Sequence, residues 1–234
     1  MSKQRSVRGT CTYCGRTREI TDDHVPPQNI FPSPRPPDLI TVPACRQCNQ
    51  GSSREDEYFR IAILGPAALH DPRARKLWDG PVVRGLRRSI LERKASFAIE
   101  FEASLREFEE RDSQGRVIGV SRARMISKER LDPTVERIVR GLLSREYDEY
   151  RPSDDVGFNI EIGLVRNRDP EGLAKRLLHG NAVARSVATG IFQYWHYAAH
   201  GGPNRSDWLL TFYRTIGFRV RLIPAQRPPR SRPS

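Results

Sequence analysis

Two short stretches with the same spacing decide how the N-terminal part of this chain folds, CTYCG at residues 11–15 and CRQCNQG at residues 45–51. Each stretch contains two cysteines three positions apart. The four cysteines are Cys11, Cys14, Cys45 and Cys48. Two CxxC pairs in one short segment are typical of a tetrahedral Zn²⁺ site with four thiolate ligands. Because four sulfur ligands close the coordination sphere, such a zinc ion folds the segment and does not activate water.

Two other interpretations of the cysteines are weaker. A redox CxxC pair is expected within a βαβ pattern, and neither pair lies in one. Unpaired buried thiols would leave the matched spacing without a reason. No apolar run follows the opening MSKQRSVRGT, and no window approaches the about 18 apolar residues of a membrane span. We therefore expect a cytoplasmic protein with no membrane partner, in which cysteines bind metal more often than they form disulfides.

The composition indicates a polyanionic partner. Among the 234 residues, 40 Lys and Arg face 28 Asp and Glu, which gives a net charge of +12 and a pI near 10.1. Such an excess favours association with nucleic acid, although solubility and a basic tail would also explain it. The sequence does not predict an oligomeric state.

The segment between the cysteine pairs is longer than a usual zinc-ribbon loop. It contains TDDHVPP at residues 21–27 and seven prolines from Pro26 to Pro43, which exclude a regular helix and allow short extended pieces. Closing the four cysteines around one ion would bring this segment back over the helix that follows the second pair. Asp23, His24 and Asn49 could then meet around one point.

The types of these three residues suit cleavage of a phosphodiester bond. A carboxylate oxygen and an amide oxygen are ligands for Mg²⁺ or Mn²⁺, and an imidazole without metal can take a proton from an attacking water. Asp22 is an alternative ligand to Asp23. Since neighbouring side chains on an extended segment point to opposite sides, only one of the two is expected on the metal side.

The order CxxC, Asp-His, CxxC-Asn over residues 11–60 resembles the HNH endonucleases, whose ββα-metal site lies on a zinc-stapled treble-clef fold in many members. The resemblance implies that His24 is the general base and that Asp23 binds the catalytic divalent ion, Mg²⁺ or Mn²⁺. It also implies that Asn49 is a second ligand of that ion. DNA is favoured over RNA as the substrate only by this resemblance.

The sequence departs from the family pattern in two places. A middle Asn usually precedes the second cysteine pair, but the corresponding stretch, DLITVPAC, has none. Asn29 or Asp38 could brace the loop that carries the general base instead. A Lys often follows the final His or Asn, and here Arg54 is the nearest cation for a phosphate.

We divide the chain into a basic extension without regular structure (residues 1–10), a zinc-stapled HNH-like module (11–64), an accessory domain (65–225) and a basic Pro/Arg-rich tail (226–234). The predicted fold class is α+β. A helix is expected from Ser52 or Ser53, one of which would cap it, to about Ile63.

The accessory domain is predicted to have a mainly antiparallel sheet with helices on one side. The expected helices lie within residues 66–80, 81–95, 131–150 and 169–178. The expected strands are a hairpin on both sides of the DSQGR turn (112–116), with Phe97, Ile99 and Phe101 in its first strand, and strands within 156–165, 190–199 and 207–223. Leu105 and Phe108 also fit a helix. The aromatic residues near the C-terminus are expected to form the core rather than a base-stacking face.

A rival interpretation is a treble clef that binds nucleic acid or a protein without cutting, with His24 as an exposed or supporting residue. The other histidines are less informative. His196 and His200 are four positions apart, a spacing that suits a metal on a helix, but the segment is predicted to be a strand, where this spacing has no meaning.

Overall fold

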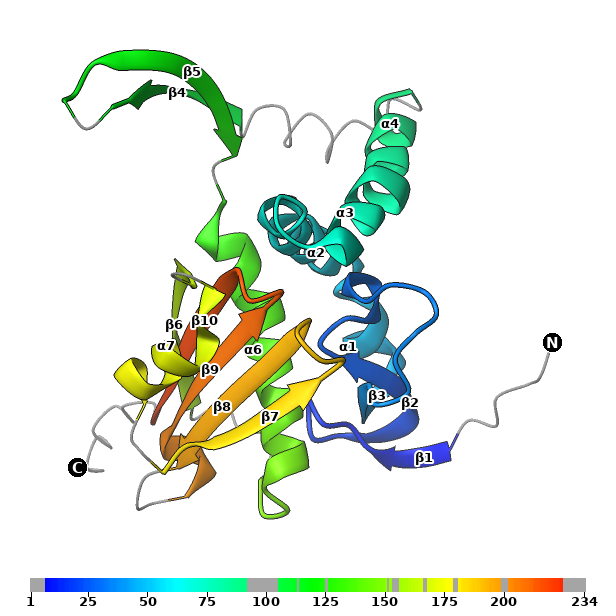
Figure 1. Ribbon diagram of the computed structural model, residues 1–234. Helices are drawn as coiled ribbons and strands as arrows, with labels where there is room; N and C mark the ends of the chain where they lie inside the picture. Colours follow the sequence, from blue (N-terminus) through cyan, green and yellow to red (C-terminus); the bar gives the residue numbers. More distant parts are fainter. Residues whose placement is uncertain are drawn as a thin grey trace, which may run out of the picture.

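The computed structural model describes residues 7–91, 105–112, 114–124, 126–150, 152, 156–165, 168–178, 181–198 and 202–224. In this part of the chain, helices and antiparallel sheets occur together, as the predicted α+β class requires (Figure 1). No helix of the described residues is long and apolar enough to cross a membrane.

The N-terminal part is a three-stranded antiparallel sheet followed by two helices. Its elements are β1 (Val7–Thr10), β2 (Thr17–Val25), the 3₁₀ turn η1 (Gln28–Ile30), β3 (Ile40–Cys45), α1 (Arg46–Gln50) and α2 (Ser53–Ala67). The sheet order is β1-β2-β3, and β2 pairs with β3 so that Asp23 lies opposite Val42 and His24 opposite Thr41. The prediction of no regular structure before Cys11 is wrong for β1, because β2 supplies its hydrogen-bond partners.

The helix predicted after the second cysteine pair is α2, which ends four residues later than expected, at Ala67. Ser52 occupies the N-cap position, but its side chain does not cap the helix. The Ser52 hydroxyl instead contacts the Arg137 guanidinium and lies 3.4 Å from Asp56 Oδ2. The cap prediction therefore holds for the position and fails for the hydrogen bond.

The remaining elements complete two more sheets and their helices. They are α3 (Pro72–Leu77), the π-helical turn η2 (Trp78–Val82), α4 (Val83–Leu91), β4 (Leu105–Arg111), β5 (Val117–Arg124), α6 (Lys128–Glu146), β6 (Val156–Leu164), α7 (Pro170–Leu177), β7 (Val183–Val187), β8 (Phe192–Ala198), the 3₁₀ turn η4 (Pro203–Arg205), β9 (Ser206–Phe212) and β10 (Ile216–Pro224). Strands β4 and β5 form a hairpin, in which Leu105 and Phe108 are extended rather than helical. The stretch from Phe97 to Phe101 lies outside the described residues.

The second sheet is antiparallel with the order β6-β10-β9-β8-β7. Helix α6 packs against one face, where Tyr194, Trp208 and Leu210 are buried, and α7 packs on the other face against Trp195 and Leu209 (Figure 1). The prediction of helices on one side only is therefore wrong. Successive side chains of a strand point to opposite faces of the sheet. Because β8 and β9 carry apolar side chains on both faces, both faces must be covered by other elements.

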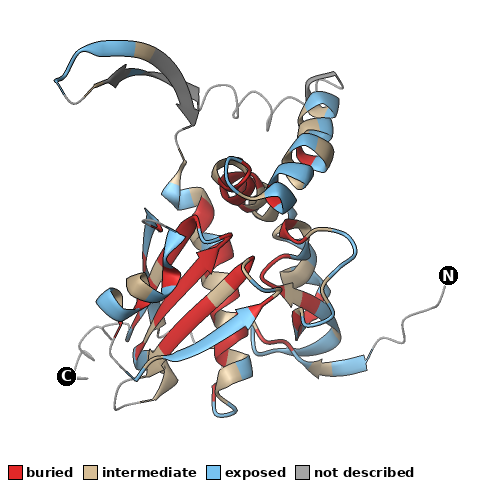
Figure 2. Ribbon diagram, in the orientation of Figure 1, coloured by how far each residue is buried: buried red, intermediate tan, exposed pale blue. Residues whose placement is uncertain are grey.

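Most aromatic residues of β8, β9 and β10 lie in the core, as predicted, whereas Tyr197 is only partly buried. Phe212 is fully buried and its ring lies 4.9 Å from that of Phe192 and 5.2 Å from that of Phe59 of α2. Figure 2 shows buried residues along the sheet, α6 and α2. One cluster of buried residues includes Val25 and Val42 of the N-terminal sheet together with Leu142 of α6. The N-terminal sheet and the five-stranded sheet thus share a hydrophobic core.

Helix α6 approaches β2 closely at Gly141. A Cβ built on Gly141 would lie 2.6 Å from Val25 Cγ2, the residue after His24. Only glycine permits this approach. A contact shorter than about 3 Å between a Cβ and Val25 would force α6 or the Val25 side chain to move. The position of the Asp-His segment is therefore set by a helix more than a hundred residues further along the chain.

We expect Gly141→Ala to destabilise the protein by about 1–3 kcal/mol, although alanine is the better helix former. The control is Gly85→Ala on α4, where no atom of the described residues lies within 4 Å of the added Cβ. That substitution is expected to be neutral or to stabilise by up to about 1 kcal/mol. Denaturant unfolding of both variants measures the change in the free energy of unfolding. An equal increase in both variants would contradict the close contact between Gly141 and Val25.

Candidate metal centres and the adjoining hollow

The four cysteines meet at the junction of the N-terminal elements. Cys11 and Cys14 lie in the turn between β1 and β2, Cys45 ends β3, and Cys48 lies in α1. The four Sγ atoms lie within 4.8 Å of one another, and those of Cys14 and Cys45 are 4.0 Å apart. A tetrahedral zinc ion with Zn–S bonds of about 2.3 Å places its sulfur atoms about 3.8 Å apart. The cluster can therefore hold one metal ion such as zinc.

The surroundings of the cluster favour a thiolate at Cys11. Burial raises the pKa of this thiol, but backbone hydrogen bonds involving Cys45, Cys14 and Tyr13 outweigh burial and lower the pKa to about 7. Burial and the neighbouring thiols raise the pKa of Cys48. Four thiolates so close together would repel one another, so the cysteines cannot all ionise without a cation. A divalent metal ion bound between them removes this repulsion.

A hollow of about 410 Å³, which we call the Asp-His hollow, is bordered by α1, the helix that carries Cys48. The residues that line it include Asp22, Asp23, His24, Asn29, Asn49 and Asp56. The three residues that the sequence predicted to meet, Asp23, His24 and Asn49, thus border the same space. They come from the end of β2 and from α1, which are joined by hydrogen bonds from Asn49 to β2.

The two neighbouring aspartates differ in burial. Asp22 is exposed, Asp23 is 7% exposed, and His24 is intermediate. This alternation follows from the extended backbone of β2 and agrees with the expectation that the two carboxylates point to opposite sides. The side chain of Asp23 shares its side of the strand with Val25, which packs into the core.

Asp23 contacts two residues, Tyr13 and Arg137, that no sequence motif indicates. The Tyr13 hydroxyl donates to Asp23 Oδ2 over 2.7 Å, and Arg137 Nη1 of α6 lies 3.8 Å from the same oxygen. Burial, together with Asp23, raises the pKa of Tyr13, so the hydroxyl remains a donor. The guanidinium also pairs with Asp56 of α2. Burial raises the pKa of Asp56, and Arg137 opposes this shift.

Asn49 is anchored to β2 through its amide nitrogen. Nδ2 donates to Thr21 Oγ1 over 3.0 Å and to the Asp22 carbonyl over 3.2 Å. These two bonds use both amide hydrogens, so the oxygen Oδ1 is the atom suited to a cation. Among the described residues, the buried oxygen Asn29 Oδ1 has no hydrogen-bond partner. The hollow therefore offers carboxylate and amide oxygens, which are the ligands that Mg²⁺ and Mn²⁺ take in proteins.

The proposed substitutes for the missing middle Asn lie in different surroundings. Asn29 borders the Asp-His hollow, whereas Asp38 accepts a hydrogen bond of 2.9 Å from the backbone of Ala188 and so ties the loop to the second sheet. Arg54 is exposed on the first turn of α2. It is not among the residues that line the hollow.

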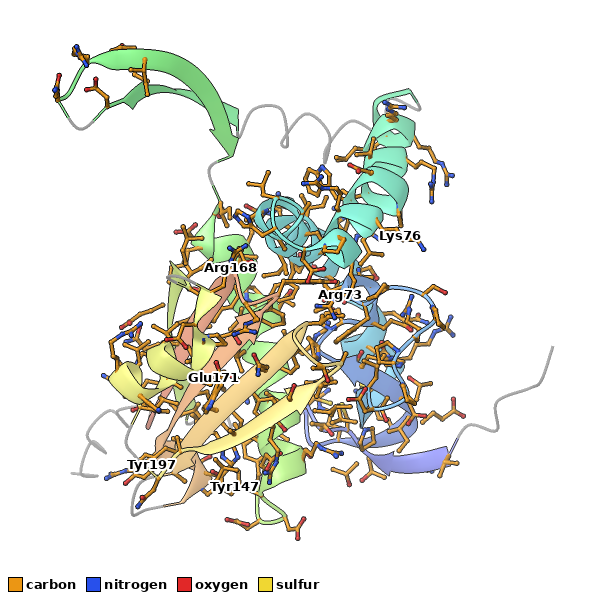
Figure 3. The ribbon with its side chains drawn as sticks, in the orientation of Figure 1. Arg73, Lys76, Tyr147, Arg168, Glu171 and Tyr197 are labelled. Atoms are coloured by element: carbon orange, nitrogen blue, oxygen red, sulfur yellow. The ribbon has the colours of Figure 1, made fainter. Side chains whose placement is uncertain are left out.

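A second polar cluster lies at the far end of α6. His196 of β8 is buried and stacks on Trp208, its Nδ1 lies 2.8 Å from the Tyr147 hydroxyl, and its Nε2 lies 3.3 Å from Glu146. Figure 3 shows Tyr147 at this end of the helix. His196 is on a strand, as predicted, and His200 lies outside the described residues. Burial lowers the pKa of His196, and Glu146 opposes the shift.

Neither a family model, a curated protein nor a solved structure matches this chain. The functional interpretation therefore depends on the residues that border the Asp-His hollow and on the adjoining cysteine cluster.

Proposed function

We propose that this chain is a metal-dependent endonuclease of the HNH type, which hydrolyses phosphodiester bonds in DNA, with a structural zinc ion on its four cysteines. The observation that carries the proposal is that Asp23, His24 and Asn49 border one hollow, and that Asn49 lies on α1, the helix that carries Cys48. The order β2, β3, α1 supports it, because a ββα-metal site is built from two strands and a helix in that order. The net charge of +12 supports a polyanionic substrate.

Each of the three residues has a role in this reaction. His24 takes a proton from the water that attacks the phosphorus atom. Asp23 and Asn49 would hold Mg²⁺ or Mn²⁺ through a carboxylate and an amide oxygen. Such an ion would supply positive charge next to the phosphate and the departing oxygen. The bond from phosphorus to that oxygen breaks as the bond to the water oxygen forms, and the departing oxygen takes a proton from solvent water.

The cysteine cluster has a structural role in the proposal. It joins the β1–β2 turn to the β3–α1 junction and so brings the Asp-His segment of β2 beside Asn49. With four sulfur ligands, its zinc ion would have no open position for water. The accessory part would position the nucleic acid, and the basic residues would add a salt-sensitive attraction to its backbone.

Incubation of the purified protein with supercoiled plasmid tests the proposal. We expect conversion to nicked or linear DNA with Mg²⁺ or Mn²⁺, and no conversion with EDTA. A plasmid that stays intact with both ions across neutral and alkaline pH would contradict the nuclease. If the same protein retarded the DNA on a gel, the rival function of a binding module that does not cut would be favoured.

A further inference from the structure

The contacts of Asp23 are unequal at its two oxygens. Both the Tyr13 hydroxyl, at 2.7 Å, and the Arg137 guanidinium, at 3.8 Å, lie at Oδ2. Asp23 also borders the Asp-His hollow. An ionised carboxylate has two acceptor oxygens, and both of these contacts use Oδ2. Oδ1 is therefore the oxygen that remains available to a cation.

The two partners of Asp23 are themselves held in place. The Tyr13 ring packs both against the buried cysteines and against the main core, and the residue lies between Cys11 and Cys14. The Arg137 side chain is 10% exposed and contacts Ser52 and Asp56 of α2 as well as Asp23. A buried guanidinium is costly unless its charge is balanced, and the carboxylates of Asp23 and Asp56 balance the charge of Arg137.

We propose that Tyr13 and Arg137 are positioning residues, which hold Asp23 by Oδ2 and direct Oδ1 to the divalent ion. This inference depends on the proposed function. It makes Asp23, and not the exposed Asp22, the metal ligand of the pair. It also links the two metal sites, because the cysteine segment that closes around zinc carries the hydroxyl that orients the second site. Partners of metal-binding carboxylates typically change metal affinity or activity by about 10–100-fold when they are removed.

Tyr13→Phe removes the hydroxyl and keeps the ring in the core. We expect Mn²⁺ binding, measured by electron paramagnetic resonance of free Mn²⁺, to weaken by about 10–100-fold. Zinc content and the melting temperature should stay close to those of the wild type. Plasmid cleavage should need more Mn²⁺ for half its maximal rate and should approach the wild-type rate at saturation, because Tyr13 does not contact the reacting atoms.

The matched control is Tyr147→Phe, which also removes a hydrogen-bonded tyrosine hydroxyl but at the His196 cluster. Its Mn²⁺ affinity should equal that of the wild type. Arg137→Lys, which keeps the charge and loses the forked geometry, should weaken Mn²⁺ binding as Tyr13→Phe does. If the wild type binds Mn²⁺ and cuts, but Tyr13→Phe binds it equally well, the positioning role is wrong and the nuclease stands. If the wild type binds no Mn²⁺, both proposals fail together.

Discussion

Replacing Cys45 by serine is expected to release the zinc ion and to destabilise the β1–β2–β3 sheet more strongly than the five-stranded sheet with which it shares a core. Cys45 is 2% exposed, ends β3 and lies opposite Ile20 of β2. Zinc binding by structural cysteine sites contributes about 10–16 kcal/mol in zinc-finger peptides. Losing most of that contribution exceeds any single core substitution, for which about 2–5 kcal/mol is typical.

Elemental analysis and hydrogen exchange measure this effect. The wild type should contain about one zinc ion per chain. In Cys45→Ser the zinc content should fall toward zero, and the amides of β2 should exchange faster than those of β9. The control is Thr17→Ser, a change at an exposed position of β2, the strand that pairs with β3. This variant should keep its zinc. Wild-type protein that contains no zinc when purified without chelator would overturn the structural zinc site.

His24→Ala is expected to slow plasmid cleavage by about 10²–10⁴-fold, the usual contribution of a general base. His24 borders the Asp-His hollow from the end of β2, and it is not among the proposed ligands. Mn²⁺ binding should therefore persist in this variant, and excess Mn²⁺ should not restore the rate. This behaviour distinguishes the base from Tyr13, whose loss excess Mn²⁺ is expected to offset.

The control for His24→Ala is His70→Ala, which removes an exposed histidine after α2. Its cleavage rate should match that of the wild type. Imidazole added to His24→Ala should restore part of the activity, since a free base can then take the proton from water. Equal rates for His24→Ala and the wild type, with both preparations free of contaminating nuclease, would remove His24 from the mechanism.

Local patterns predicted much of the secondary structure. Helix α6 is predicted correctly because its apolar residues recur at the helical period. All five of them are buried, namely Val135, Ile138, Val139, Leu142 and Leu143. Strand β1 was missed, because a four-residue strand with exposed side chains has no apolar alternation of its own. The cover on both faces of the second sheet was also missed, since alternation predicts a strand without saying how many faces a helix will bury.

The sequence by itself determined the cysteine cluster and the candidate set Asp23, His24 and Asn49, because the CxxC spacing and the neighbouring residue types are local features. Only the tertiary structure decided which aspartate is buried and what holds it. Arg137 lies more than a hundred residues from Asp23 in the sequence. The apolar pattern of its helix predicts which residues of α6 are buried in the core, but not that Arg137 contacts Asp23. No local spacing can show that contact, because it depends on α6 packing against β2, where Gly141 lets the two backbones approach.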